Sequence, residues 1–248
     1  MKTFSVVNQK GGVGKTTTVL NLGAALGKKG RKVLIIDLDS QANLSRSFGI
    51  GKTIDKHIGT VLAREHQAKD VIINKGIDII PSSLELLKYE KLISSEETYQ
   101  FILEETIKPL QKLYDYCLID CPPSLSTLTV NALVASDFYL IPLQPEFYSY
   151  DGLRTITDFA QKLTKLNPKL QLAGIFPTKY NPNARKRLNH DVIEHTKELF
   201  QEKVLSVYIR DNVSLAESPL NQTDVFTYAP ESNGAKDYMQ LANLIVKL

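Results

Sequence analysis

The stretch that most constrains this chain is QKGGVGKTT, residues 9–17, which directly follows the strand-like run Phe4-Ser5-Val6-Val7. A strand, a glycine-rich turn and then Lys-Thr at a helix start is the layout of a phosphate-binding loop. Glycines let such a backbone turn tightly and aim N–H groups at phosphate oxygens, and the helix that begins at Lys15 adds its positive end. A solvated lysine in a glycine-rich turn would not require the whole Gly-Lys-Thr-Thr run. The predicted nucleotide-binding residues are Gly11, Gly12, Val13, Gly14, Lys15, Thr16 and Thr17.

Two of these residues have predicted chemical roles. Lys15 is placed to reach the β- and γ-phosphates of ATP, and the Thr16 hydroxyl to hold Mg²⁺. The stretch departs from the usual G-x-x-x-x-G-K-[ST] pattern, because the first glycine would fall on Gln9 and a second lysine, Lys10, follows it.

A second strand and a pair of acids follow the loop. Residues 15–29 have a helical apolar face that ends at Gly30, and then comes the unbroken run Val33–Ile36. Strand, helix and strand at this spacing predict a parallel βαβ unit. Asp37 and Asp39 follow at the carboxyl end of the second strand, where open α/β sheets bind ligands. They could also cap a following helix, but their distance from the phosphate loop favours the ligand site.

Further strands complete an α/β pattern. The run 114–119 ends in Asp120, a Walker B pattern whose carboxylate would hold Mg²⁺ through water. Additional strands are predicted at 77–80, 137–142, 170–178 and 204–209, a helix at 98–113 and a final helix after residue 235. The expected fold is one doubly wound, mostly parallel sheet of the P-loop NTPase class, forming a single domain over residues 1–248.

The stretch from Lys10 to Thr17 resembles the deviant Walker A motif of the ParA/MinD family of partition ATPases, closest to ParA-type members without an N-terminal helix-turn-helix. This resemblance implies that Lys10 crosses a dimer interface and contacts the nucleotide of the other subunit. It implies that Asp39 positions the attacking water and that Asp37 supports the metal shell. The resemblance further assigns nucleotide contacts to Thr178, Tyr180 and Asn212. The catalytic set that it implies is Lys10, Lys15 and Asp39, and the metal set is Thr16, Asp37 and Asp120.

The resemblance breaks at one late segment. The family has I-P-R-N-V there, whereas this chain has Ile209 to Val213 reading IRDNV, so Arg210 replaces the proline and Asp211 the arginine. A basic contact of the family's arginine could be made by Arg210 only from a shifted position.

The overall charge does not identify a partner. The net charge is +3, with 43% hydrophobic and 23% charged residues, so contact with a polyanion requires a local patch. Three adjacent cations, 185–187, more often form a solvated face, but the family resemblance raises the weight of DNA binding. The candidate DNA contacts are Arg185, Lys186, Arg187, Arg210, Lys236 and Lys247.

Other features limit the alternatives. No apolar run approaches the ~20 residues of a membrane span, and no signal-peptide pattern precedes the first strand. Cys117 and Cys121 lie about 13 Å apart on an extended segment, too far for a disulfide, and are expected to be buried thiols of a cytoplasmic protein.

The leading hypothesis is an ATP- and Mg²⁺-dependent homodimer that binds nonspecific DNA and is released by slow hydrolysis, stimulated by a ParB-like adaptor. This predicts a cytoplasmic, nucleoid-associated protein without a membrane partner. The alternative is a MinD-like membrane-associated positioning ATPase, which calls for a basic amphipathic tail that the final helix lacks. An iron protein or a dethiobiotin-synthetase-like ligase fits poorly. The cargo, whether plasmid, chromosome, carboxysome or chemotaxis cluster, is not specified by the sequence.

Overall fold

One seven-stranded sheet organises the part of the chain that the computed structural model describes, residues 1–147, 149–183 and 187–248. Its strand order is β3-β4-β2-β5-β1-β6-β7, and all neighbouring strands are parallel except β3 and β4. This confirms the predicted doubly wound, mostly parallel sheet. The strands are β1 (Lys2–Val6), β2 (Val33–Asp37), β3 (Ile73–Asn74), β4 (Asp78–Ile80), β5 (Tyr116–Asp120), β6 (Phe138–Leu143) and β7 (Gln171–Pro177).

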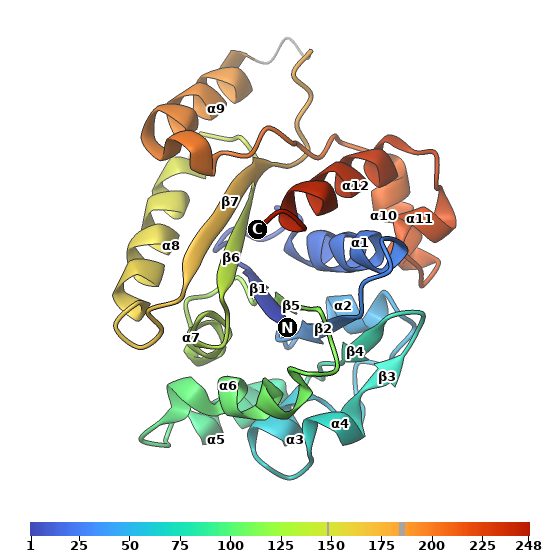
Figure 1. Ribbon diagram of the computed structural model, residues 1–248, viewed down its shortest axis with the longest axis vertical. Helices are drawn as coiled ribbons and strands as arrows, with labels where there is room; N and C mark the ends of the chain where they lie inside the picture. Colours follow the sequence, from blue (N-terminus) through green and yellow to red (C-terminus); the bar gives the residue numbers. More distant parts are fainter. Residues whose placement is uncertain (148, 184–186) are drawn as a thin grey trace.

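Helices cover both faces of the sheet (Figure 1). On one face lie α1 (Lys15–Lys28), α10 (Val213–Leu220), α11 (Val225–Tyr228) and α12 (Asn233–Ile245), with the short α2 (Asn43–Arg46) beside them. The other face carries α3 (Ile58–Leu62), α4 (Ala68–Val71), α5 (Leu86–Ile93), α6 (Ile102–Ile107), α7 (Thr127–Val134), α8 (Ser149–Leu163) and α9 (Arg187–Phe200). Three 3₁₀ turns complete the described elements: η1 (Tyr99–Phe101), η2 (Lys108–Leu110) and η3 (Gln201–Lys203).

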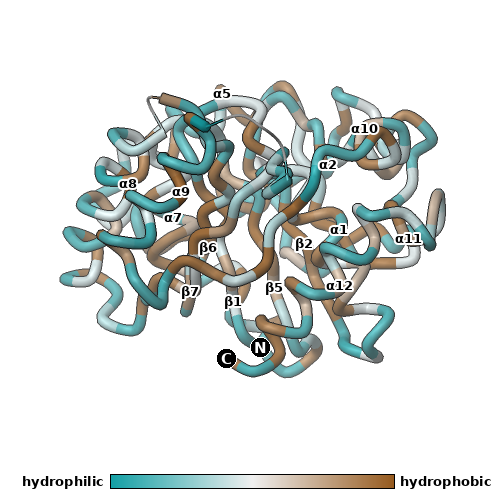
Figure 2. Tube along the Cα trace, turned by 90° about the horizontal axis from the view of Figure 1, so that it is seen from above, coloured by the Kyte–Doolittle hydropathy of each residue, from teal (hydrophilic) through white to brown (hydrophobic). Residues whose placement is uncertain are grey.

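The central strands are apolar along their whole length because both of their faces are covered. Successive side chains of a strand point to opposite faces, so Leu34 and Ile36 of β2 pack into the core beneath α3 to α8, while Ile35 packs into the core beneath α1 and α12. Figure 2 shows this as brown segments in the inner strands and teal stretches on the outer helices.

Two expected elements differ in the structure. The predicted strand 204–209 is not a strand: among its residues Val204 makes an isolated bridge to Ile175 of β7 and Ile209 one to Thr178, just after β7, and the chain bends between them. Backbone hydrogen bonds persist at the two ends of the run, from the Leu205 amide to the Ile175 carbonyl and from the Ile209 amide to the Pro177 carbonyl, both at 2.8 Å, and Leu205 also packs closely on Gly174, where an added Cβ would lie 2.5 Å from its side chain. The predicted helix 98–113 is split into η1, α6 and η2, with Pro109 inside the last 3₁₀ turn.

The carboxyl edge of the sheet gathers the predicted site. The phosphate loop follows β1, and the ends of β2 and β5 bring Asp37 and Asp120 into register as neighbours. Thr178 follows the end of β7 at the same edge. Because parallel strands all end on one side, segments more than a hundred residues apart meet there. No helix among the described residues has the length and apolar character needed to cross a membrane.

Candidate nucleotide-binding site

The loop after β1 has the backbone shape that phosphate binding requires. Gly12 and Gly14 have φ of 74° and 95°, in the left-handed region that favours glycine, and Gly14 is the N-cap of α1. Asn8 fixes the start of the loop, since its Oδ1 accepts from the Lys10 amide at 3.0 Å and its Nδ2 donates to the Pro142 carbonyl at 2.8 Å. The loop is thus held open with its amides at a helix N-terminus.

Lys15 is a buried cation with little to neutralise it. Only 8% of the residue is exposed, and its Nζ donates to the Lys10 carbonyl at 3.4 Å. Burial lowers the pKa of Lys15, and the opposing effect of nearby Asp120 is smaller. An anionic ligand against this ammonium group would supply the missing counter-charge.

Thr16 and Asp120 form a pair suited to a divalent cation. The Thr16 hydroxyl donates to Asp120 Oδ2 at 2.7 Å, while the buried Asp120 Oδ1 has no hydrogen-bond partner among the described residues. Burial, and then the neighbouring Asp37, raises the pKa of Asp120. Within the described ranges no group of three or more His, Cys, Asp or Glu residues could hold a metal ion. A hydroxyl and a carboxylate therefore fit Mg²⁺ only if phosphate oxygens and water complete its shell.

Asp37 organises the neighbouring loop. It is fully buried, its Oδ1 accepts from the Asp39 amide at 3.1 Å, and its Oδ2 accepts from the Ser45 amide at 2.9 Å and the Ser45 hydroxyl at 2.7 Å. Burial raises the pKa of Asp37 to about 6. Ser45 Oγ in turn accepts from the Ser82 amide at 2.8 Å. The three hydrogen bonds that Asp37 accepts fit a residue that supports the metal ligands from behind, and direct metal ligation by Asp37 stays a prediction.

Asp39 is placed to act on a ligand. It is half-buried and lines the same cavity as the phosphate loop, and its Oδ1 accepts from the Gln41 amide at 2.9 Å. One carboxylate oxygen is thereby fixed by the backbone, and the role of Asp39 in positioning water stays a prediction.

The loop opens into a cavity of about 950 Å³, a volume that holds a nucleotide. Thr178 lines it and braces the loop, since its hydroxyl donates to the Val13 carbonyl at 2.8 Å. Asn212 also lines it: its Oδ1 caps α10 by accepting from the Ser214 amide at 2.9 Å, and this cap does not use the Asn212 Nδ2 donor. Two of the three predicted late contacts therefore meet at the cavity.

Tyr180 is the exception, and the predicted base contact needs correction. Its side chain is buried away from the cavity, with its hydroxyl 3.0 Å from His190 Nδ1 and its ring perpendicular to that of Tyr208. Lys179 has a left-handed φ of 50° and lines the cavity in its place. The change of backbone direction at Lys179 turns the next side chain into the core.

Sequence reasoning missed one wall of the cavity. Arg46 lines it from the end of α2, Lys52 from the segment that follows, and Tyr238 from α12. The segment approaches the end of α10 so closely that a Cβ on Gly49 would lie 2.3 Å from Gln222 Oε1. In the sequence, two cations that flank a pair of glycines could have indicated a binding wall here. The stretch has no hydrophobic periodicity, however, from which its position in the fold could be predicted.

Lys10 is directed away from its own cavity. Residues Gly11 to Thr17 all line the cavity, whereas Lys10 is not among the described residues that line it. Its Nζ instead lies 2.5 Å from Glu146 Oε2, and both side chains are about half exposed, at 40% and 52%.

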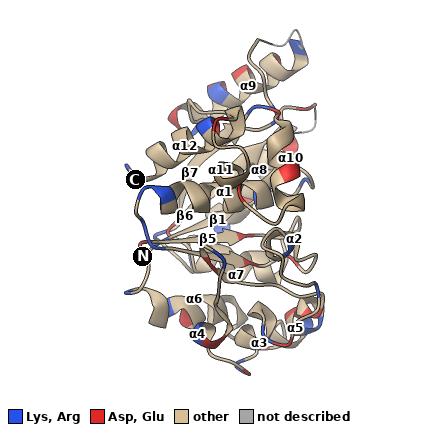
Figure 3. Cartoon of the chain, turned by 90° about the vertical axis from the view of Figure 1, so that its right-hand side faces the viewer, with Lys and Arg blue, Asp and Glu red and all other residues tan. Residues whose placement is uncertain are grey.

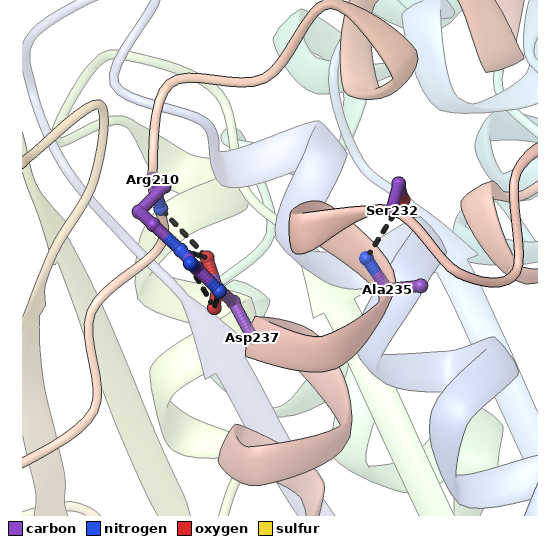
Figure 4. Close-up of polar contacts among 4 residues, drawn as sticks. All are labelled: Arg210, Ser232, Ala235 and Asp237. Atoms are coloured by element: carbon purple, nitrogen blue, oxygen red, sulfur yellow. Dashed lines mark hydrogen bonds and ion pairs between the residues drawn. The ribbon is translucent and has the colours of Figure 1, made fainter.

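The predicted DNA contacts that the structure describes lie on separate elements. Arg210 is folded inward, where its guanidinium pairs with the buried Asp237 at 2.6 Å and its backbone amide donates to the same carboxylate at 2.9 Å (Figure 4). Lys236 lies in the first turn of α12, 3.7 Å from Glu231, and Lys247 follows the other end of that helix. Arg187 starts α9 with a 94% exposed side chain. Arg185 and Lys186 lie outside the described residues. The ion pair with Asp237 offsets the charge of Arg210, whose side chain is one-third exposed, so its contact with DNA stays a prediction.

Comparison with known proteins agrees with this geometry. A family model described as an AAA domain matches residues 1–172. The chain is 37% identical to the sporulation initiation inhibitor protein Soj of Bacillus subtilis, over 97% of this chain and 96% of that one, and 35% identical to the chromosome partitioning protein ParA of Caulobacter vibrioides, over 99% and 94%.

A solved structure resembles the whole chain. Cobyrinic acid a,c-diamide synthase from Mycobacterium smegmatis, with bound ATP analog and magnesium, superposes with a TM-score of 0.87 at 29% identity, covering 100% of this chain and 95% of that one. Both relatives align over nearly their full length, and the phosphate loop carries the extra lysine. The chain therefore belongs to the ParA/MinD family of P-loop ATPases.

Proposed function

We propose that residues 1–248 act as a single ATPase domain that dimerises around ATP and Mg²⁺ and moves cargo by cycling on and off DNA. The observation that carries this proposal is the direction of Lys10, which leaves its own cavity and extends from an exposed loop. Members of the family are ATP-dependent dimers, and a lysine in this position can neutralise phosphate charge in a partner subunit.

Each polar group of the site then has a task. Loop amides and Lys15 hold the phosphates and favour the charge that develops on them during cleavage. Thr16 and Asp120 would hold Mg²⁺, which supplies charge neutralisation when bound. Asp39, whose one oxygen is fixed by the Gln41 amide, orients the attacking water. ATP favours the dimer, because both subunits contact its phosphate charge. Hydrolysis removes the terminal phosphate and with it this contact, so the dimer then dissociates.

The carboxylate of Glu146 competes for Lys10 in the single chain. A half-exposed ion pair contributes up to about 1 kcal/mol, and dimerisation must break it before Lys10 can reach a partner. Glu146→Gln should therefore strengthen ATP-dependent dimerisation by up to about fivefold. Light scattering across a protein dilution series with ATP measures this, with Glu198→Gln on α9 as the charge-matched control. Weaker dimerisation of the Glu146 variant would instead mean that this carboxylate acts within the dimer.

The proposal includes DNA binding and an adaptor partner, and it is supported by the relative in Caulobacter vibrioides, which is named a chromosome partitioning protein. The protein would then act in the cytoplasm on the nucleoid. Binding should require ATP, ignore base sequence and fall steeply from low to moderate salt, because phosphate contacts release counterions and a dimer doubles their number.

Co-sedimentation with duplex DNA and with anionic liposomes, each with and without ATP, tests this choice of partner. The triple variant Arg185→Ala/Lys186→Ala/Arg187→Ala should bind DNA more weakly and still dimerise with ATP, whereas Lys88→Ala/Lys91→Ala on α5 should change neither property. Equal DNA binding without nucleotide, or ATP-dependent binding to liposomes alone, contradicts the proposal and favours a membrane-positioning ATPase.

A further inference from the structure

A second cavity lies at the opposite edge of the sheet, where the strands begin. It measures about 850 Å³ and is lined by the end of α1, the turn between β3 and β4, and the start of α11. Helix α1 spans the distance between the two sites: its first residue contributes to the phosphate loop and its last, Lys28, lines this cavity. At 1.5 Å per residue, the 14 residues of α1 place its two ends, at the phosphate loop and at Lys28, about 20 Å apart.

Four cations line this amino-edge cavity: Lys28, Arg31, Lys32 and Lys75. All four are exposed, and within the described part of the chain none has a carboxylate within ion-pair distance. Figure 3 shows the basic segment at the end of α1 beside the two chain termini. Lys28 lies in the last turn of α1 and can interact favourably with the negative end of the helix dipole. The other three cations lie outside the helix, and Lys75 belongs to the separate turn between β3 and β4.

The two carboxylates that line the cavity are engaged elsewhere. Asp78 accepts from Asn74 Nδ2 at 2.6 Å and from the Tyr114 hydroxyl at 2.8 Å. Asp224 caps α11, where its Oδ1 accepts from the Phe226 amide at 2.8 Å and its Oδ2 from the hydroxyl of the next residue at 2.9 Å. The cavity therefore has four cations against two carboxylates that already hold structural hydrogen bonds.

The walls leave room for a ligand and offer it an apolar surface. No atom lies within 4 Å of the position of an added Cβ at Gly27 or Gly76, and both glycines line the cavity. Leu113, 56% exposed, and Ile77 provide apolar contact on one side. The volume is within the range of small-molecule sites.

We propose that the amino-edge cavity binds an anion that carries at least two neighbouring phosphate groups, independently of the phosphate loop. The planar guanidinium of Arg31 suits bidentate contact with one phosphate, and lysines from two walls neutralise a second. The phosphates could belong to a free nucleotide-like compound or to a strand of DNA, and the experiment separates these sources.

Calorimetric titration with inorganic pyrophosphate tests the proposal. The protein is first saturated with a fluorescent ADP, without added Mg²⁺, so that retained fluorescence shows that the phosphate loop stays occupied. One pyrophosphate per chain should then bind. The affinity should fall at least about tenfold in Arg31→Gln/Lys75→Gln, which removes one cation from each wall. Lys162→Gln/Lys165→Gln, an equal loss of exposed charge at the end of α8, should stay within about twofold.

Parallel titrations with a short DNA duplex identify the source of the phosphates. If pyrophosphate does not bind but duplex affinity falls only in the Arg31/Lys75 variant, the anion site stands and DNA supplies the phosphates. The proposal is overturned if neither ligand distinguishes this variant from its control, or if pyrophosphate binds only by displacing the labelled ADP. Circular dichroism of both variants verifies folding, and unchanged ATP turnover separates this result from any failure of the ATPase proposal.

Discussion

Lys15→Ala is expected to abolish nucleotide binding, with a loss of at least about 100-fold in affinity. The reason is that the Lys15 ammonium is buried at the end of the loop, where each charge-assisted contact with phosphate contributes about 1.5–3 kcal/mol. Titration with a fluorescent ATP analogue measures the affinity, and the thermal melting of each variant confirms that it is folded.

The matched control is Lys29→Ala at the other end of α1, whose exposed Nζ donates to Asn243 Oδ1 at 2.9 Å. This variant should bind nucleotide normally. Thr16→Ala should resemble Lys15→Ala when Mg²⁺ is present, because it removes the hydroxyl paired with Asp120. Near-normal ATP affinity of the Lys15 variant would refute the assignment of the site.

Asp39→Ala is expected to bind ATP but to lose at least about 100-fold in hydrolysis, leaving a trapped dimer. Asp39 lines the cavity without belonging to the phosphate loop, so its removal spares the phosphate contacts and takes away the carboxylate that orients water. Steady-state phosphate release measures turnover, and light scattering with ATP measures the dimer.

Asp55→Ala, which removes an exposed carboxylate of the loop before α3, is the control and should leave both quantities unchanged. Unimpaired turnover in the Asp39 variant, or a monomer with bound ATP, would remove Asp39 from the water-positioning role.

Local sequence predicted those parts of the site that depend on neighbouring residues. The phosphate loop is contiguous, and its glycines, strand and helix start impose one backbone shape wherever they occur together. The acids that end β2 and β5 were equally predictable, because an apolar strand of a parallel sheet carries its last side chain to the ligand edge.

Positions set by packing were not predictable in this way. Tyr180 lies one residue beyond a left-handed Lys179, and that single backbone conformation decides whether the ring faces the cavity or His190. The run 204–209 has the composition of a strand, but it pairs with the neighbouring chain only at its two ends, through isolated bridges at Val204 and Ile209. From the sequence alone Arg210 is expected to be a surface cation, but α12 brings the Asp237 carboxylate within 2.6 Å of its guanidinium.

The sequence by itself determined the class of this protein: a phosphate loop with an extra lysine, parallel βαβ units, and acids at strand ends. Only the tertiary structure decided which of these groups meet. The Thr16 hydroxyl and the Asp120 carboxylate are 104 residues apart, and sheet register places them 2.7 Å from each other. The same folding directs Lys10 away from its own cavity and leaves four cations around a second one. Short-range preferences fix backbone shape, whereas charge pairing and cavities arise between distant segments and depend on how the layers pack.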